Sequence, residues 1–196
     1  MYDQFLPLIL FGIATAFTPG PNNILSSYSG FNFGFKKTIP LMLGVILGWT
    51  TMLTIMASGL IIIFQKYIFL QSFIKILGTI FLIYLAYKIA FASTNASENI
   101  KKPVRFFDTF LFQFINPKGV MVAMIAVSSF IDVQNNYLRD ASIVIIAYFF
   151  MAVFSVSSWC LLGKYLRNFA TSENFIKKFN YSMSFLLIVC VIMFYV

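Results

Sequence analysis

The sequence predicts an all-α integral membrane protein in which six transmembrane helices form two inverted three-helix repeats, with helices 1 and 4 broken. The first observation is composition. Hydrophobic residues make up 60% of the 196 residues and charged residues 10%, whereas soluble domains are roughly 45–50% apolar and about 25% charged. The second is the recurrence of apolar runs long enough to cross a bilayer. The third is a pair of proline motifs, half a chain length apart, that interrupt two of these runs.

The lengths of the apolar runs define the spans. They place six spans near residues 5–27, 39–64, 68–91, 107–131, 141–163 and 176–195. Each run is close to the roughly 20 residues that a helix needs to cross the hydrocarbon core. The remainder consists of short turns and one longer polar connection at 93–103, too little for a soluble domain. We therefore expect a single transmembrane domain over residues 1–196, with repeats at approximately 1–98 and 99–196.

Basic residues are distributed unevenly between the loops. The odd-numbered loops and their flanks hold Lys36, Lys37, Lys88, Lys101, Lys102, Arg105, Lys164, Arg167, Lys177 and Lys178, whereas the even-numbered loops hold Lys66 and Arg139. Because basic loops are retained in the cytoplasm, both termini are expected to be non-cytoplasmic. No Lys or Arg precedes Lys36, so the first apolar run lacks the basic start of a signal peptide and is interpreted as a retained helix.

Proline motifs interrupt the first and fourth spans. The first motif is Thr18, Pro19, Gly20, Pro21, Asn22 and Asn23, and the second is Asn116, Pro117 and Lys118 followed by glycine. Proline inside a helix removes a hydrogen bond and costs about 3 kcal/mol, so both helices should be broken there. Each half of the chain has three spans, an odd number, so the second half must cross the membrane in the opposite sense. This is the inverted-repeat plan of many secondary transporters.

The two breaks supply the groups of a binding site near the bilayer midplane. Unwound backbone exposes N–H and C=O groups, and a half-helix beginning at Pro21 or Pro117 presents its N-terminal N–H groups to an anion. The amides of Asn22, Asn23 and Asn116 add donors and acceptors, and the charge of Lys118 suits a carboxylate. The two motifs together predict binding of a small zwitterionic solute. All nine motif residues are candidate substrate-binding residues.

Structural interpretations compete with these functional ones. A proline kink can occur in a transmembrane helix without a ligand, and Lys118 can extend to the interface if its span is shifted. Gly44 and Gly48 form a GxxxG motif, which is typical of close helix packing and leaves a homo-oligomer open. Trp49 is interpreted as a core residue in preference to a pocket wall. Asp108 is interpreted as an N-terminal helix cap at the interface.

Several functional classes are disfavoured. The basic residues lie in short loops and form no continuous stripe, which argues against a nucleic-acid partner. Histidine is absent, and Cys160 and Cys190 lie in separate apolar runs, so no metal site and no cofactor are expected. An intramembrane enzyme would need a nucleophile with a base or a pair of membrane carboxylates, and the sequence displays neither. No phosphate-binding loop is present, so a carrier would be driven by an ion gradient or by the solute gradient itself. A channel or a membrane scaffold stays open as an alternative to a carrier.

These residues resemble the LysE/RhtB family of amino-acid exporters along nearly the whole chain. The resemblance is carried by residues 18–23, 34–37, 77–88 and 114–118. Phe81, Ala86 and Tyr87 depart from the family's common Tyr, Gly and Trp. The resemblance implies export from a bacterial cytoplasm through the inner membrane, with both proline motifs near the translocation path.

Finer features of the sequence are similar to the members of this family that export cysteine and O-acetylserine. They are residues 19–25, residues 85–90 and the pair Gln113 and Phe114. This likeness adds Gln113 to the candidate substrate-binding residues. It implies a neutral amino acid as the substrate of a secondary transporter that works by alternating access, with another amino acid such as threonine or homoserine as the alternative.

Overall fold

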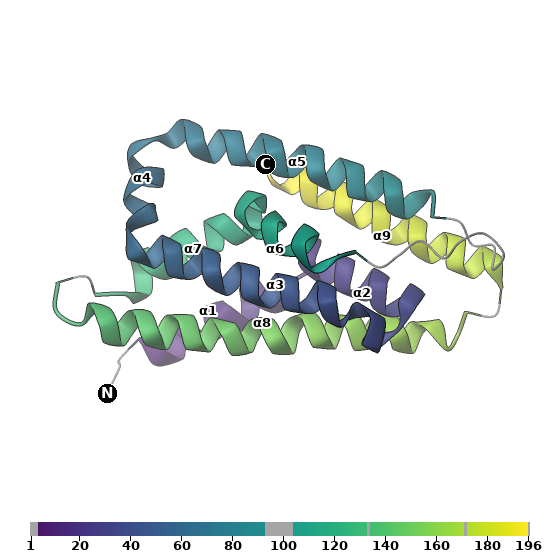
Figure 1. Ribbon diagram of the computed structural model, residues 1–196, viewed down its shortest axis with the longest axis horizontal. Helices are drawn as coiled ribbons and strands as arrows, with labels where there is room; N and C mark the ends of the chain where they lie inside the picture. The colour runs from purple at the N-terminus through teal and green to yellow at the C-terminus, as the bar shows by residue number, and fades with distance from the viewer. Residues whose placement is uncertain (1–3, 93–103, 133, 171, 196) are drawn as a thin grey trace.

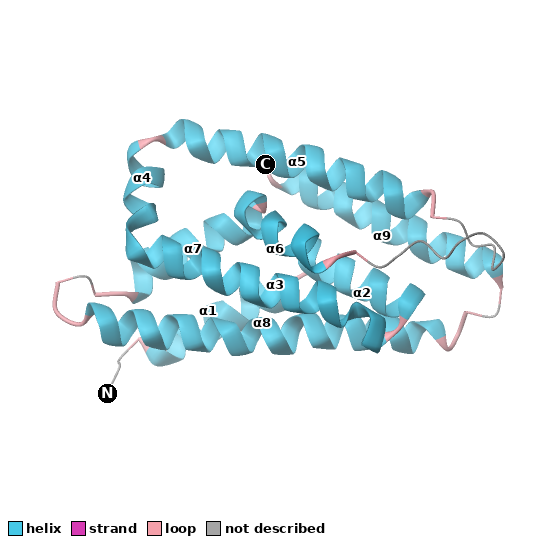
Figure 2. Cartoon of the chain, in the orientation of Figure 1, coloured by secondary structure: helices cyan, strands magenta, loops and turns pink. Residues whose placement is uncertain are grey.

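The computed structural model of the protein describes residues 4–92, 104–132, 134–170 and 172–195. The regular structure in these residues is entirely helical (Figure 2). The elements are α1 (Phe5–Phe17), α2 (Pro21–Phe33), α3 (Phe35–Ile55), the π-helical turn η1 (Met56–Leu60), α4 (Ile61–Lys66), α5 (Ile68–Ala90), α6 (Phe106–Ile115), α7 (Pro117–Phe130), α8 (Tyr137–Arg167) and α9 (Glu173–Met193). The predicted polar connection at 93–103 lies outside the described residues.

Six helical segments cross the molecule. Four are long and apolar enough to span a bilayer without being joined to a neighbour, namely Phe35–Lys66, Ile68–Ala90, Tyr137–Arg167 and Glu173–Met193. The pairs α1 with α2 and α6 with α7 also pass this test when taken together, and they bend by 52° and 60°. Figure 1 shows each bent pair running from one end of the molecule toward the other, so each pair is one broken span. The predicted all-α membrane fold and both predicted helix breaks are confirmed.

The second span has a break that the sequence did not reveal. Residues 39–64 were expected to form one uninterrupted helix, but Gly59 inside η1 has a φ of 121°. This left-handed region is accessible mainly to glycine and cannot continue an α-helix. The chain therefore turns at η1, and α4 runs across the end of the bundle to reach α5 (Figure 1).

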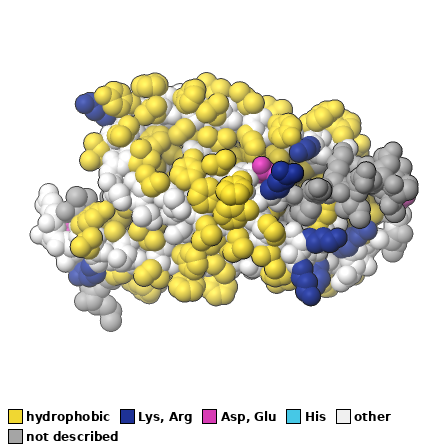
Figure 3. Space-filling view, viewed as in Figure 1, with side chains coloured by type: hydrophobic (Ala, Val, Ile, Leu, Met, Phe, Trp, Pro, Cys, Tyr) yellow, Lys and Arg dark blue, Asp and Glu magenta, His cyan; other side chains and the backbone are white. Residues whose placement is uncertain are grey.

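The outer surface matches a lipid environment. Large apolar side chains are exposed on every span, for example Leu6, Phe69, Leu111 and Phe154, each more than 60% exposed. Figure 3 shows hydrophobic side chains covering most of the visible face, with Lys and Arg gathered mainly toward one end. Water would penalise this much exposed apolar surface, whereas hydrocarbon does not.

Glycines allow the helices to approach closely. An added Cβ at Gly44 would collide with the Phe106 carbonyl oxygen, and one at Gly48 would lie 2.6 Å from the Phe110 carbonyl oxygen. The predicted packing role of this GxxxG motif is confirmed, because it brings α3 against α6 within one chain. Because these two glycines pack against α6 of the same chain, the motif gives no support to a homo-oligomer. A homo-oligomer stays a prediction.

Polar groups at the helix ends have structural partners. A carboxylate oxygen of Asp108 accepts the Arg105 backbone N–H at 3.2 Å, which confirms its predicted capping role. Asp140, at the start of α8, is only 3% exposed and pairs with Arg139 at 2.9 Å. Asp140 also accepts the backbone N–H of Asp132, which closes the turn between α7 and α8.

Candidate functional site

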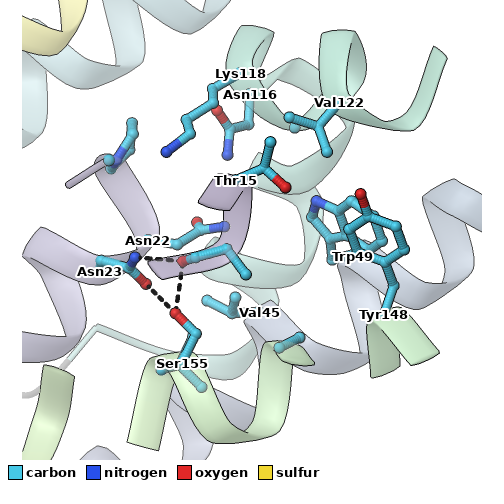
Figure 4. A pocket seen from close by; sticks show the side chains of 16 residues that line it. Thr15, Asn22, Asn23, Val45, Trp49, Asn116, Lys118, Val122, Tyr148 and Ser155 are labelled. Atoms are coloured by element: carbon cyan, nitrogen blue, oxygen red, sulfur yellow. Dashed lines mark hydrogen bonds between the residues drawn. The ribbon is translucent and has the colours of Figure 1, made fainter. Parts of the chain in front are cut away.

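The two helix breaks meet at one cavity of about 70 Å³ (Figure 4). At roughly 10–15 Å³ for each water molecule on this measure, the cavity has room for several waters or a small polar solute. The residues that line it come from α1, α2, α3, α7 and α8 and from the breaks themselves. They are Thr15, Ala16, Gly20, Pro21, Asn22, Asn23, Val45, Trp49, Asn116, Lys118, Gly119, Val122, Tyr148, Ala152, Ser155 and Val156.

The predicted site residues gather around this cavity, although not all of them line it. The cavity wall contains Gly20, Pro21, Asn22, Asn23, Asn116 and Lys118. Thr18 and Pro19 are exposed beside it and hold the Lys118 ammonium group. Pro117 is buried at the first position of α7, where it packs against Gly78 of α5. Gln113 lies behind Asn22.

The carbonyl groups that the first break releases are covered by side chains. The Asn23 side-chain amide donates to the Ala16 carbonyl at 2.7 Å and to the Thr18 carbonyl at 3.0 Å. The Ser155 hydroxyl of α8 lies 2.7 Å from the Ala16 carbonyl and 3.1 Å from the Asn23 side-chain oxygen. The Asn23 side chain is therefore engaged in hydrogen bonds that stabilise the break, and dashed lines mark such bonds in Figure 4.

Lys118 connects the second break to the first. Its Nζ donates to the Thr18 hydroxyl at 2.8 Å and lies 3.3 Å and 3.4 Å from the carbonyl oxygens of Thr18 and Pro19. The carbonyl end of a helix is the negative end of its dipole, so a cation is favoured there. Gly20 leaves space for the ammonium group, since an added Cβ would lie 3.0 Å from Nζ. In this conformation Lys118 links the two halves of the chain across the cavity.

Asn22 and Gln113 form a reciprocal amide pair. The Asn22 amide donates to Gln113 Oε1 at 2.8 Å, and the Gln113 amide donates to Asn22 Oδ1 at 3.1 Å. The Gln113 amide also donates to the Thr109 carbonyl at 2.8 Å, and the side chain is fully buried. Gln113 therefore orients Asn22, and its influence on a bound solute would pass through that neighbour.

The N-terminal ends of α2 and α7 remain open toward the cavity. Their N-cap residues are Gly20 and Asn116, and among the described residues no side chain caps either helix. The first intrahelical bonds run from the N–H of Ile24 to Gly20 and from the N–H of Val120 to Asn116, each at 2.9 Å. The N–H groups that precede them in each helix have no carbonyl acceptor within the helix. These groups belong to Asn22, Asn23, Lys118 and Gly119.

An aromatic wall closes the other side of the cavity. Trp49 of α3 stacks on Tyr148 of α8 with ring centroids 4.9 Å apart, and Val122 of α7 lies beside them. Trp49 was expected in the core, and it is both a buried core residue and part of the cavity wall. Tyr148 and Ser155 were missed, because α8 is a long apolar helix with no proline or charge at their depth to mark them.

Two buried polar atoms at this site lack hydrogen bonds. The Tyr148 hydroxyl and Asn116 Oδ1 have no hydrogen-bond partner among the described residues. Both side chains are more than nine-tenths buried. Buried polar groups are almost always paired, so each of these atoms calls for a hydrogen-bond partner beyond the described residues, such as a water or a bound solute.

A helical membrane protein whose two broken spans meet at a buried polar cavity has the architecture of a solute transporter. Comparison with known proteins assigns its family. The chain belongs to the LysE type translocator family, whose sequence profile matches residues 13–196. It is therefore a multi-pass membrane exporter of amino acids and not an enzyme.

The curated relatives considered share one name. The cysteine/O-acetylserine efflux proteins of Salmonella typhimurium and Salmonella typhi are each 30% identical over 184 residues, covering 92% of this chain and 91% of theirs. The protein of the same name from Escherichia coli is 27% identical over 183 residues, with the same coverage. No solved structure matches the chain.

Proposed function

We propose that the protein exports a small neutral amino acid, cysteine or O-acetylserine, which binds in the cavity between the two helix breaks. The observation that carries this proposal is the open N-terminal ends of α2 and α7 at one cavity, beside carbonyl groups that are already covered. The names of the relatives support the same substrates.

The balance of donors and acceptors favours a carboxylate in the cavity. The carbonyls of Ala16 and Thr18 already accept hydrogen bonds from side chains, whereas the first N–H groups of α2 and α7 lie outside the helical ladder. Two helix N-termini at one cavity supply donors and a positive potential, which together suit an anionic group. The carboxylate of the amino acid would bind there, and its ammonium group would meet side-chain oxygens, including Asn116 Oδ1.

We further propose alternating access between two inverted halves, residues 1–98 and 99–196. Each half contains one broken span followed by two long helices, and the first long helices of the two halves, α3 and α8, pack against each other. The last helices of the two halves, α5 and α9, pack in the same way. Contacts between corresponding elements are what a pseudo-two-fold axis in the membrane plane produces. Rocking about these contacts would expose the cavity to each side in turn.

The proposed orientation places both termini outside the cytoplasm, in a bacterial inner membrane. The first turn of α3 contains Lys36 and the last turn of α8 contains Arg167. Figure 1 shows the start of α3 and the end of α8 at the same end of the bundle, and the connection between α7 and α8 at the opposite end. In a protein with Cys160 and Cys190 replaced by alanine, a cysteine at Asn135 should react with a membrane-impermeant maleimide added to intact cells. A cysteine at Asn168 should react only after permeabilisation, and the reverse pattern would invert the topology.

Efflux from proteoliposomes tests the proposed function. Purified protein should release preloaded radiolabelled cysteine and O-acetylserine with saturable kinetics, at least tenfold faster than protein-free liposomes. Threonine and homoserine, loaded separately, test the alternative substrates. A carrier also exchanges labelled for unlabelled solute, whereas a channel shows neither saturation at low concentration nor accelerated exchange. Release of none of the four solutes would contradict the proposal.

A further inference from the structure

We propose that Trp49, Tyr148 and Val122 form the side-chain subsite of the cavity, and that the Tyr148 hydroxyl selects amino acids whose short side chain carries a hydrogen-bonding atom. This inference rests on the proposed function, because it assumes that an amino acid occupies the cavity. It adds a specificity-determining residue, Tyr148, that neither the proline motifs nor the resemblance indicated.

The cavity has two chemically different sides. Figure 4 shows Asn22 and Asn23 on one side and the Trp49 and Tyr148 rings on the other, with Val122 above the rings. The first side offers amides and helix N-termini, and the second offers apolar ring and methyl surfaces. A zwitterionic head group bound by the polar side would leave the solute's side chain pointing at the aromatic wall.

Tyr148 is held rigidly in this wall. Its ring is 3% exposed and stacks on Trp49 at 4.9 Å, so the hydroxyl cannot swing out to find water. The Thr15 side chain lies close to the Tyr148 hydroxyl, but the Thr15 hydroxyl donates to the Phe11 carbonyl of its own helix at 2.8 Å. The Tyr148 hydroxyl lacks a hydrogen-bond partner among the described residues. A solute atom that accepted or donated a hydrogen bond there would satisfy a buried group.

The chemistry of the solute determines whether that bond forms. The acetyl carbonyl of O-acetylserine is a good acceptor for a phenolic O–H, and a cysteine thiol is a weak donor and acceptor. The ethyl side chain of 2-aminobutyrate is close in size to the cysteine side chain but has no hydrogen-bonding atom, so it leaves the hydroxyl unpaired. A site built to hydrogen-bond a substrate group discriminates strongly against analogues that lack it. The cavity should therefore prefer O-acetylserine to 2-aminobutyrate.

Tyr148→Phe removes the hydroxyl and keeps the stacked ring. In proteoliposomes, the ratio of kcat/KM for O-acetylserine to that for 2-aminobutyrate should fall about tenfold, mainly through a higher KM for O-acetylserine. Because no hydrogen bond joins the hydroxyl to any described residue, the melting temperature should stay the same or rise. Tyr84→Phe is the matched control on an exposed face of α5 and should leave both the ratio and the melting temperature unchanged.

Three outcomes would overturn the subsite. The first is an unchanged ratio in Tyr148→Phe, and the second is an equal loss for both solutes, which would indicate a structural role. The third is a lower melting temperature, which would show that the hydroxyl already has a partner. If the wild-type protein transports O-acetylserine and one of these results appears, only this inference fails. If the wild-type protein transports no amino acid, the proposed function fails as well.

Discussion

Lys118→Met should reduce the efflux of O-acetylserine by about 100-fold in kcat/KM while the protein remains in the membrane at its normal abundance. Methionine keeps an apolar stem of similar length but removes the ammonium group that donates to Thr18 and Pro19. A charged hydrogen bond is worth about 1.5–3 kcal/mol, and a hundredfold loss corresponds to about 2.7 kcal/mol. The measurement is the initial rate of efflux per reconstituted protein at several solute concentrations.

Two controls separate the position of this charge from its mere presence. Lys75→Met removes a lysine of α5 whose ammonium lies 4.3 Å from the Tyr195 ring centroid and which does not line the cavity, and it should retain wild-type efflux. Lys118→Arg keeps the charge, but a planar guanidinium cannot place three donors as an ammonium does, so activity should fall to an intermediate level. Wild-type efflux by Lys118→Met would move the binding site elsewhere.

Gly163→Ala should lower the melting temperature by roughly 6–12 °C and reduce the yield of monodisperse protein. The physical reason is the contact between α8 and α2, where an added Cβ at Gly163 would collide with the Ser27 carbonyl. One turn earlier on α8, the Cys160 carbonyl faces Gly30 with equally little space. Overpacking of this kind costs about 1–3 kcal/mol, and a backbone obstacle places this site at the upper end.

Gly12→Ala is the matched control for this packing prediction. Its added Cβ would also be too close to a neighbour, but that neighbour is the sulfur of Met151, a flexible side chain that can change rotamer. The melting temperature should therefore fall by no more than about 3 °C, on the scale of roughly 2–4 °C for each kcal/mol. Equal losses in the two variants would show that α2 and α8 are not locked by their backbones. Both melting curves can be recorded in detergent by intrinsic fluorescence.

The sequence predicted those features that have a large local cost. Prolines in an apolar run, as at Pro19 and Pro117, must break a helix wherever the rest of the chain lies. A GxxxG motif such as Gly44 and Gly48 has little use other than close packing. These signals need no knowledge of tertiary contacts, and the structure contains both breaks and the glycine contact.

The features that were missed depend on tertiary contacts. Gly59 is one of several glycines in apolar runs, and its positive φ follows from the turn toward α4. Tyr148 faces the cavity only because α8 packs beside α1 and α2, and no spacing in the sequence identifies which tyrosine does so. Gln113 and Asn23 were predicted to touch solute, but their amides are engaged by Asn22 and by the first break. Whether these side chains also contact the solute remains a prediction.

At the first helix break, the carbonyl groups are covered by side chains while the N-terminal N–H groups of α2 and α7 stay open, and this difference should exclude cationic solutes from the cavity. The cavity walls contain Lys118 and two helix N-termini, and none of the described lining residues is Asp or Glu. A solute with an additional positive charge would be repelled with no acid to offset the repulsion, and desolvation would add to this cost. In the proposed transport cycle, the charge of a cytoplasmic amino acid would therefore limit its export more than its shape. Diamino acids would be retained in the cell however well their carbon skeletons fit the cavity.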